Sequence, residues 1–236
     1  MKLEDKNIYL GDIHGNLTVI DNYLILNEIN NCNIIQVGDF GLGFASKEFE
    51  WEQLDVINER LKKDNNFLYA IRGNHDNKKC FYDYYDFSNI YFIKDYEVIN
   101  LKGDNHLFIG GAISIDRKYR TEGKTYWNDE VFILDEERLG NIFDIDIVVT
   151  HTAPDFCDPR NYNNNFPYVV LQFTDRDKDL LKDLNEERAN MTKAYEKIIE
   201  NNNIKWWIYG HFHKNNIEEI DGVNFRVIGI NDFIIL

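Results

Sequence analysis

Five short segments of the sequence place aspartate, asparagine or histidine directly after an apolar run. In chain order they are Gly11-Asp12-Ile13-His14, Gly38-Asp39, Gly73-Asn74-His75-Asp76, Thr150-His151 and Gly210-His211-Phe212-His213. Five of the six histidines lie in these segments, and only His106 stands apart. Because the flanking glycines let the backbone turn tightly, we expect the polar side chains to project beyond strand ends, where they could hold a ligand.

Together these residues offer imidazole nitrogens, carboxylates and an amide oxygen, but no thiolate. Such donors suit Mn, Fe, Zn or Co at a reactive site better than a structural zinc ion. They are too many for one ion, whereas two ions about 3.5 to 4 Å apart, bridged by one carboxylate, would use them and would promote in-line displacement at phosphorus. The donor set therefore predicts a phosphoesterase with two metal ions.

Each of these residues also has a plainer interpretation. Asp12, Asp39 and Asn74 follow glycine and could cap helices or form Asx-turns. The histidines could be exposed or packed in a core, and this remains the favoured interpretation for His106, which begins the run HLFIGG. For the others, their joint placement at strand ends favours metal ligation.

The first part of the chain alternates strands and helices. Strands are predicted at 7–10, 33–37 and 67–71, with helices at about 17–29 and 47–63 between them. This order predicts a parallel sheet whose carboxyl ends gather ligands. Beyond residue 90, shorter strands predict a second sheet, at 90–93, 96–101, 106–109, 145–150, 206–209, 223–228 and 233–236. Residues 176–202 contain an amphipathic helix, and 155–168 form a long loop next to the site.

Bulk properties limit the class of protein. The 236 residues, 44% of them hydrophobic, predict one domain spanning 1–236. A net charge of −15 disfavours long nucleic acid as a partner unless a basic groove or bound cations reverse the field. The three cysteines are widely spaced and suggest neither disulfides nor a zinc site, and the apolar runs are too short to span a bilayer. We therefore expect a cytoplasmic protein without a membrane partner.

The ordered segments D-x-H, GD, GNH-D, H and GHxH resemble the motifs of the calcineurin-like metallophosphoesterases, near but not within their protein Ser/Thr phosphatase branch. The resemblance runs from Asp12 to His213 and so covers most of the chain. It implies an α/β (α+β) fold, a four-layer αββα sandwich of two mixed β-sheets flanked by helices.

The resemblance also implies a role for each site residue. Asp12, His14 and His213 would hold one metal ion, Asn74, His151 and His211 would hold the second, and Asp39 would bridge both. His75 would protonate the leaving oxygen or stabilise its charge, with Asp76 orienting the His75 ring and raising its pKa. The nucleophile would be a hydroxide between two divalent ions, Mn in the first place and Fe, Zn, Co or Ni as alternatives.

The match departs from the phosphatase branch in one segment. That branch has the pattern GDxVDRG, but this chain has GDFGLGF and so lacks an arginine that clamps phosphate, and Asp76 stands where the branch has glutamate. Protein dephosphorylation is therefore in doubt, and Arg72, Arg117 or Arg160 would have to replace the clamp. Arg117 and Arg120 could bind phosphate or lie on a solvated surface, and Trp127 and Glu130 are expected to pack near the site.

The predicted function is divalent-metal-dependent hydrolysis of phosphomonoesters or small phosphodiesters. The substrate would be a phosphorylated small molecule, a nucleotide or a phosphoprotein. One alternative is a phosphodiesterase or nuclease of the same superfamily. Another is a non-catalytic scaffold that holds metal, and a third is a hydrolase or oxygenase with a single metal ion, which would leave half of the donors unused.

Overall fold

The computed structural model describes residues 4–159 and 168–236, which contain two mixed β-sheets. The first sheet has the strand order β11-β1-β2-β3-β4. Strands β1 to β4 run parallel, and β11 pairs antiparallel with β1. The bounds are β1 Asn7–Leu10, β2 Asn33–Gln36, β3 Phe67–Ala70, β4 Ile90–Phe92 and β11 Phe233–Ile235.

The second sheet has the order β5-β6-β7-β8-β10-β9. Its four inner strands are parallel, and the edge strands β5 and β9 are antiparallel to their neighbours. The bounds are β5 Glu97–Leu101, β6 Asp104–Ile109, β7 Ile147–Thr150, β8 Trp206–Tyr209, β9 Asn216–Ile220 and β10 Val223–Val227.

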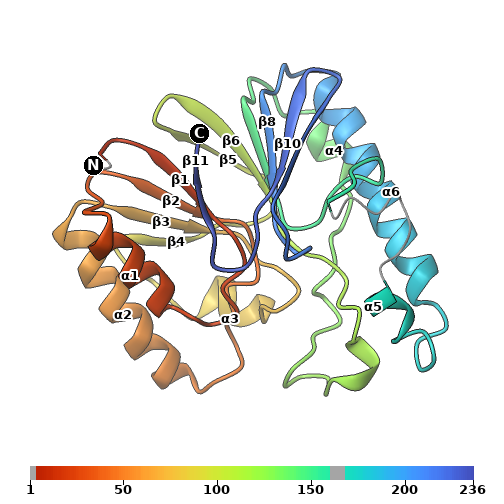
Figure 1. Cartoon of the computed structure of the whole chain (residues 1–236), viewed down its shortest axis with the longest axis horizontal. Coiled ribbons are helices and arrows are strands. Elements are labelled where there is room, and N and C mark those ends of the chain that lie inside the picture. The colour runs from red at the N-terminus through yellow and green to blue at the C-terminus, as the bar shows by residue number, and fades with distance from the viewer. Residues whose placement is uncertain (1–3, 160–167) are drawn as a thin grey trace.

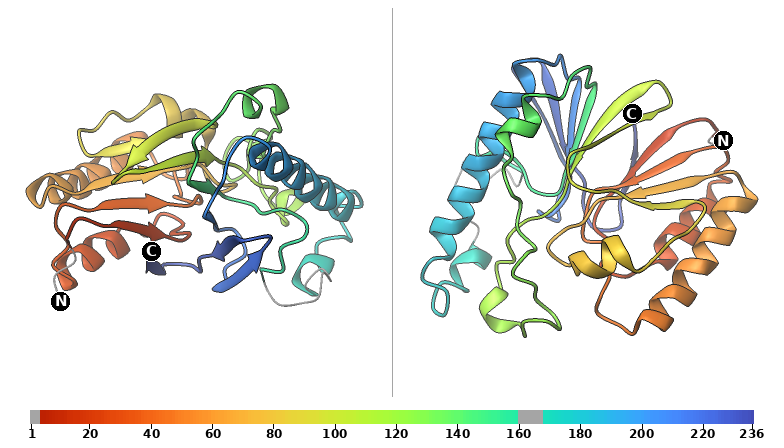
Figure 2. Two further views of the ribbon diagram at one scale, coloured as in Figure 1. Left: turned by 90° about the horizontal axis from the view of Figure 1, so that it is seen from above. Right: turned by 180° about the vertical axis from the view of Figure 1, so that it is seen from behind.

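Successive side chains of a strand point to opposite faces of its sheet, as β1 shows. Tyr9 joins a cluster between the sheets that includes Phe108 and Ile208, whereas Ile8 and Leu10 point outward. The outward face is covered by α1 (Thr18–Leu26) and α2 (Lys47–Lys63), and the second sheet is covered by α4 (Glu136–Leu139) and α6 (Leu180–Ile199). Figures 1 and 2 show these helices on opposite sides of the paired sheets. The chain therefore has the predicted αββα sandwich.

Two strands join a different sheet from the one predicted. The strands β4 and β11, expected in the second sheet, complete the edges of the first one through pairs such as Leu68 with Ile90 and Ile8 with Ile235. Further elements have no counterpart in the sequence prediction: β9, α3 (Lys78–Asp83), α4, α5 (Tyr168–Leu171) and a 3-10 turn at Arg117–Tyr119. Most of the predicted 155–168 loop lies outside the described residues.

The carboxyl ends of the parallel strands of both sheets meet at one edge of the sandwich, where Nδ1 of His151, after β7, lies 2.8 Å from the carbonyl oxygen of Val37, after β2. The turns after β1, β2, β3, β7 and β8 carry the five polar segments. No helix in the described ranges is long and apolar enough to cross a membrane.

Candidate metal centre

Strained turns deliver several of the predicted donors. His14, Asp39, His211 and His213 have positive φ values of 46°, 57°, 67° and 54°. Residues other than glycine adopt this conformation rarely, and it persists where the surroundings enforce it, often at functional sites. Each of the four residues follows within a few positions of a strand end, so the turn aims its side chain across the rim of the sheets.

The described residues include two groups whose ligand atoms lie within 4.8 Å of one another. One group contains Asp12, His14, Asp39 and His213, and the other contains Asp39, His151 and His211. In the first group, Nε2 of His213 lies 3.2 Å from Oδ2 of Asp12 and 3.2 Å from Nε2 of His14. In the second, Nε2 of His151 lies 3.1 Å from Oδ1 of Asp39. Asp39 is common to both groups.

Asn74 reaches the second group through its amide oxygen. Its Oδ1 lies 3.1 Å from Nε2 of His151, while its Nδ2 donates to Oγ of Ser114 over 3.0 Å. Ser114 in turn donates to Glu130 from both its backbone N and its Oγ, over 2.6 and 2.8 Å. Because the Ser114 hydroxyl donates to Glu130, its oxygen is the acceptor for the Asn74 amide, and this leaves Oδ1 of Asn74 facing His151. Sequence reasoning did not find Ser114, since no motif marks it.

Charges in the second group are arranged as an ion pair. Burial by itself raises the pKa of Asp39, but attraction to His151 and a hydrogen bond with it hold that pKa well below the usual range. Burial lowers the pKa of His151, but Asp39 outweighs this and raises it to about 9. Burial and the neighbouring His151 lower the pKa of His211 well below its usual range. The imidazolium of His151 thus carries a positive charge where a cation would fit, and a metal ion would displace its proton.

Two glycines leave the space that this packing needs. A Cβ at Gly73 would lie 2.1 Å from Oδ1 of Asp39 and 2.7 Å from Nε2 of His151, and one at Gly210 would lie 2.3 Å from Oδ1 of Asp12. Any side chain there would push the donor atoms apart. The donor set of carboxylates, imidazoles and one amide oxygen, held this tightly, therefore fits divalent cations.

His75 lies beside the two groups and contacts an arginine. Its backbone N donates to Oδ1 of Asp39 over 2.7 Å, and its ring makes an edge contact with His14 at a centroid distance of 4.6 Å. Nη2 of Arg120 lies 2.7 Å from Nε2 of His75, and Nε of Arg120 lies 2.7 Å from Oδ1 of Asp116. Burial lowers the pKa of His75 to about 4, and Arg120 adds to this effect, so the ring is neutral at pH 7.

The arginines considered as phosphate clamps lie in different environments in the fold. Arg72 is 1% exposed and is bound by Asp95 and by the carbonyls of residues 129–131. Arg117 pairs with Asp177 and Asp183. Arg160 lies outside the described residues. Arg120 is therefore the described arginine of this set that reaches the site.

Asp76 lies in a different environment from the expected one. Its carboxylate accepts hydrogen bonds from the backbone N–H groups of Phe40, Gly41, Leu42 and Gly73, over 2.7 to 3.1 Å. Its oxygens thus tie the turn after β2 to the turn after β3. The polar partner of the His75 ring is Arg120 and not Asp76, so Asp76 acts on the site through the backbone that carries Asp39 and His75.

A cavity of about 900 Å³ opens over the centre. Its lining includes the basic residues Arg120 and Arg188 and the site residues Asp39, Asn74, His75, His211 and His213. Arg188 is already bound to the carbonyls of residues 153–155 and 157. His106 lies elsewhere, fully buried between the sheets, with Nε2 2.8 Å from the Tyr9 hydroxyl.

Comparison with solved structures finds distant similarities that extend over nearly the whole chain. The GAP50 anchor of the inner membrane complex of Plasmodium is 17% identical with a TM-score of 0.47, covering 98% of this chain and 73% of its own. A Staphylococcus aureus protein described as a 5′-nucleotidase is 15% identical with a TM-score of 0.48, covering 95% of this chain and 48% of its own. Phosphopantetheinyl hydrolase from Mycobacterium tuberculosis is 13% identical with a TM-score of 0.47, and the match covers 97% of this chain and 92% of the hydrolase.

A comparison with curated proteins found none that matches. The family described as calcineurin-like phosphoesterase matches residues 8–215, a range that contains all five polar segments. Because this match covers most of the chain, the protein belongs to the calcineurin-like phosphoesterase family.

Proposed function

We propose that the protein hydrolyses phosphomonoesters or small phosphodiesters with the help of two divalent metal ions, Mn²⁺ in the first place. The observation that carries this proposal is the position of Asp39, whose carboxylate belongs to both donor groups. A shared carboxylate is what a site for two ions requires, because it places both ions against one substrate phosphate.

The residues divide into two sets of ligands. Asp12, His14 and His213 would hold the first ion, and Asn74, His151 and His211 the second, with Asp39 between them. When bound, such ions polarise phosphoryl oxygens and lower the pKa of a water molecule that can attack phosphorus. The chain itself fixes the ligands in place through the turns described above and through the hydrogen bond from Asn74 to Ser114.

His75 and Arg120 would act on the substrate from the wall of the cavity. A guanidinium prefers the anionic oxygens of a phosphate to a neutral ring nitrogen, so substrate would draw Arg120 away from Nε2 of His75. The negative charge of the phosphate would also raise the pKa of His75 from about 4. His75 could then donate a proton to the leaving oxygen, while Arg120 neutralises charge on the phosphoryl group.

The first experiment is hydrolysis of p-nitrophenyl phosphate and bis-p-nitrophenyl phosphate by chelator-stripped protein, with Mn²⁺ returned in steps. We expect turnover that rises with Mn²⁺, and the preferred compound separates monoesterase from diesterase activity. Full activity of metal-free protein would contradict the proposal. No turnover with Mn²⁺, Ni²⁺, Zn²⁺ or Fe²⁺ would count against it and favour a scaffold that holds metal.

Two variants test the assigned roles. Asp39→Asn should lose bound metal and lower kcat by more than about 100-fold, because both ions depend on its carboxylate. His75→Asn should keep its metal and lower kcat by about 100-fold or more, with a larger loss for leaving groups that need protonation. Metal content by mass spectrometry beside the rate distinguishes the two. Wild-type metal content and rate in both variants would refute the assignment.

A further inference from the structure

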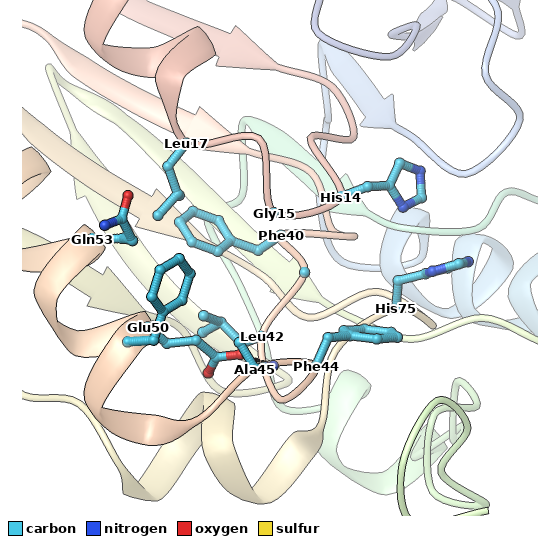
Figure 3. Close-up of a pocket in the computed structure, with 12 residues that line it drawn as sticks. His14, Gly15, Leu17, Phe40, Leu42, Phe44, Ala45, Glu50, Gln53 and His75 are labelled. Atoms are coloured by element: carbon cyan, nitrogen blue, oxygen red, sulfur yellow. Dashed lines mark hydrogen bonds between the residues drawn. The ribbon is translucent and has the colours of Figure 1, made fainter. Parts of the chain in front are cut away.

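A second, smaller pocket adjoins the centre on the other side of His14 and His75. Its volume is about 240 Å³, below the roughly 300–1,000 Å³ that encloses a drug-sized ligand. It therefore has room for one substituent of a substrate. Figure 3 shows His14 and His75 at one end of this pocket, with Leu17, Gln53 and Glu50 toward the other.

The walls of this pocket are apolar and aromatic. They include Leu17, Phe40, Leu42, Phe44 and Phe49. Phe44 and Phe49 are 44% and 56% exposed, which is a large exposure for such side chains beside a reactive centre. The ring of Phe44 stacks on His75 at a centroid distance of 6.1 Å and meets Trp127 edge to face at 5.0 Å. An aromatic ring entering the pocket would meet further aromatic side chains, with which aromatic rings pack favourably face to edge or offset face to face.

The charged residue in the wall is already satisfied. Glu50 is 7% exposed, and its Oε1 accepts hydrogen bonds from the backbone N of Gly43 and Ala45, over 2.8 and 3.0 Å. Its Oε2 accepts from the Tyr85 hydroxyl over 2.6 Å. The carboxylate thus shapes the loop and leaves the pocket without a charge to offer. Gln53, which is exposed, supplies an amide able to donate and to accept.

The loop that forms the pocket is held in place before any ligand binds. Asp76 accepts from the backbone N of Phe40, Gly41 and Leu42, and Gly15 N donates to the carbonyl of Phe40 over 2.8 Å. Ser46 caps the following helix α2 by accepting from Phe49 N. A preformed pocket avoids the ordering cost that a mobile loop would add to binding.

From these contacts we infer that the small pocket receives a planar aromatic ring, an aryl group or a nucleobase, carried on the leaving side of the phosphoester. The inference rests on the proposed function, because it places the phosphate in the larger cavity at the metal ligands and the leaving oxygen at His75. The leaving group then extends past the His14 and His75 rings into the small pocket, since both rings line both spaces. The acidic chain, and a described lining that includes Glu50 but neither lysine nor arginine, disfavour an anionic group there.

The test compares phenyl phosphate, propyl phosphate and adenosine 5′-monophosphate as substrates of Mn²⁺-loaded wild-type protein and of Phe49→Ala. The quantity is the ratio of variant to wild-type kcat/KM for each substrate, which cancels the different intrinsic reactivity of the esters. We expect Phe49→Ala to lose about five- to tenfold on one or both ring-bearing substrates and less than about twofold on propyl phosphate. Trp51→Ala is the matched control, because Trp51 is a 45% exposed aromatic of α2 that does not line the pocket.

A second variant separates the two sources of the ring. Gln53→Leu keeps apolar volume and removes the amide, so a nucleobase should lose affinity while a phenyl group should not. Equal losses on ring and propyl substrates, or no loss in Phe49→Ala, would overturn the pocket assignment while leaving the phosphoesterase intact. If wild-type protein hydrolyses none of the three esters and neither nitrophenyl compound, the proposed function itself fails, and the inference fails with it.

Discussion

Arg120 and His75 form a direct contact at the edge of the centre, with Nη2 of the arginine 2.7 Å from Nε2 of the histidine. A guanidinium carries only donors, so Nε2 is the acceptor of this short contact. Asp116 holds the other side of the guanidinium through Nε. The contact therefore holds a positive charge at the cavity wall beside the unprotonated Nε2 of His75. An anionic ligand that binds the guanidinium would separate the two side chains.

Substitution of Arg120 should impair turnover without removing metal. We expect Arg120→Ala to lower kcat/KM by about 10- to 100-fold, since a charge-assisted contact to phosphate is lost, and Arg120→Lys to restore part of it. Metal content should equal that of wild type. Arg117→Ala is the contrasting variant, because Arg117 pairs with Asp177 and Asp183 and should affect the melting temperature rather than catalysis. Unchanged kcat/KM in Arg120→Ala would exclude a role in substrate binding.

The hydrogen bonds from Asn74 to Ser114 and from Ser114 to Glu130 should be visible in metal affinity. Ser114→Ala removes the acceptor that orients the Asn74 amide, and we expect one of the two Mn²⁺ affinities to fall about 10- to 100-fold by calorimetric titration. Ser114→Thr retains the hydroxyl and should recover most of the affinity. A role limited to packing would instead change stability in both variants and leave both affinities as they are.

Asp76 should contribute mainly to stability. Replacing it with asparagine puts an NH₂ group against backbone N–H groups, and we expect the free energy of unfolding in urea to fall by about 2 to 4 kcal/mol. Asp144→Asn, at an exposed aspartate, should change it by less than about 0.5 kcal/mol. If the two variants were equally stable, the four hydrogen bonds would have no net effect on the fold.

Glu187 on α6 should make stability depend on pH. Burial raises its pKa from 4.5 to about 7. Between these values the unfolded chain releases a proton that the folded protein keeps, so the free energy of unfolding falls as pH rises from about 4.5 to 7, by up to about 3 kcal/mol. Glu187→Gln should lose the part of the decline that Glu187 contributes, while Asp76 and Glu130, whose pKa values burial raises to about 6 and about 8, keep theirs. The stability of the variant relative to wild type should therefore increase across the same range in urea titrations of metal-free protein. Glu186→Gln, at an exposed neighbour, should follow wild type.

Local sequence patterns predicted several strands and helices of this protein and the donors of its site. The alternation of apolar runs and amphipathic periods predicted β1, β2, β3 and α2, and α2 spans residues 47–63 as expected. The turn segments predicted which donors would gather, because a glycine beside a strand end permits the tight turns that other residues adopt rarely, and several parallel strands end at one rim. Asp39 and His151 follow strands of different sheets, and they lie 3.1 Å apart because the two sheets pack with these strand ends together.

Only the tertiary structure decided which partners these residues have. The strand β11 pairs with β1 although more than 200 residues separate Ile8 from Ile235, and the local hydrophobic pattern of either strand does not predict this pairing. Arg117 and Arg120 are three positions apart in one segment, but one is neutralised by two aspartates and the other reaches His75. Asp76 faces backbone N–H groups and Ser114 supports Asn74, because packing of distant segments brings them together. Residue type fixes what a side chain can bind, and long-range contacts fix what it does bind.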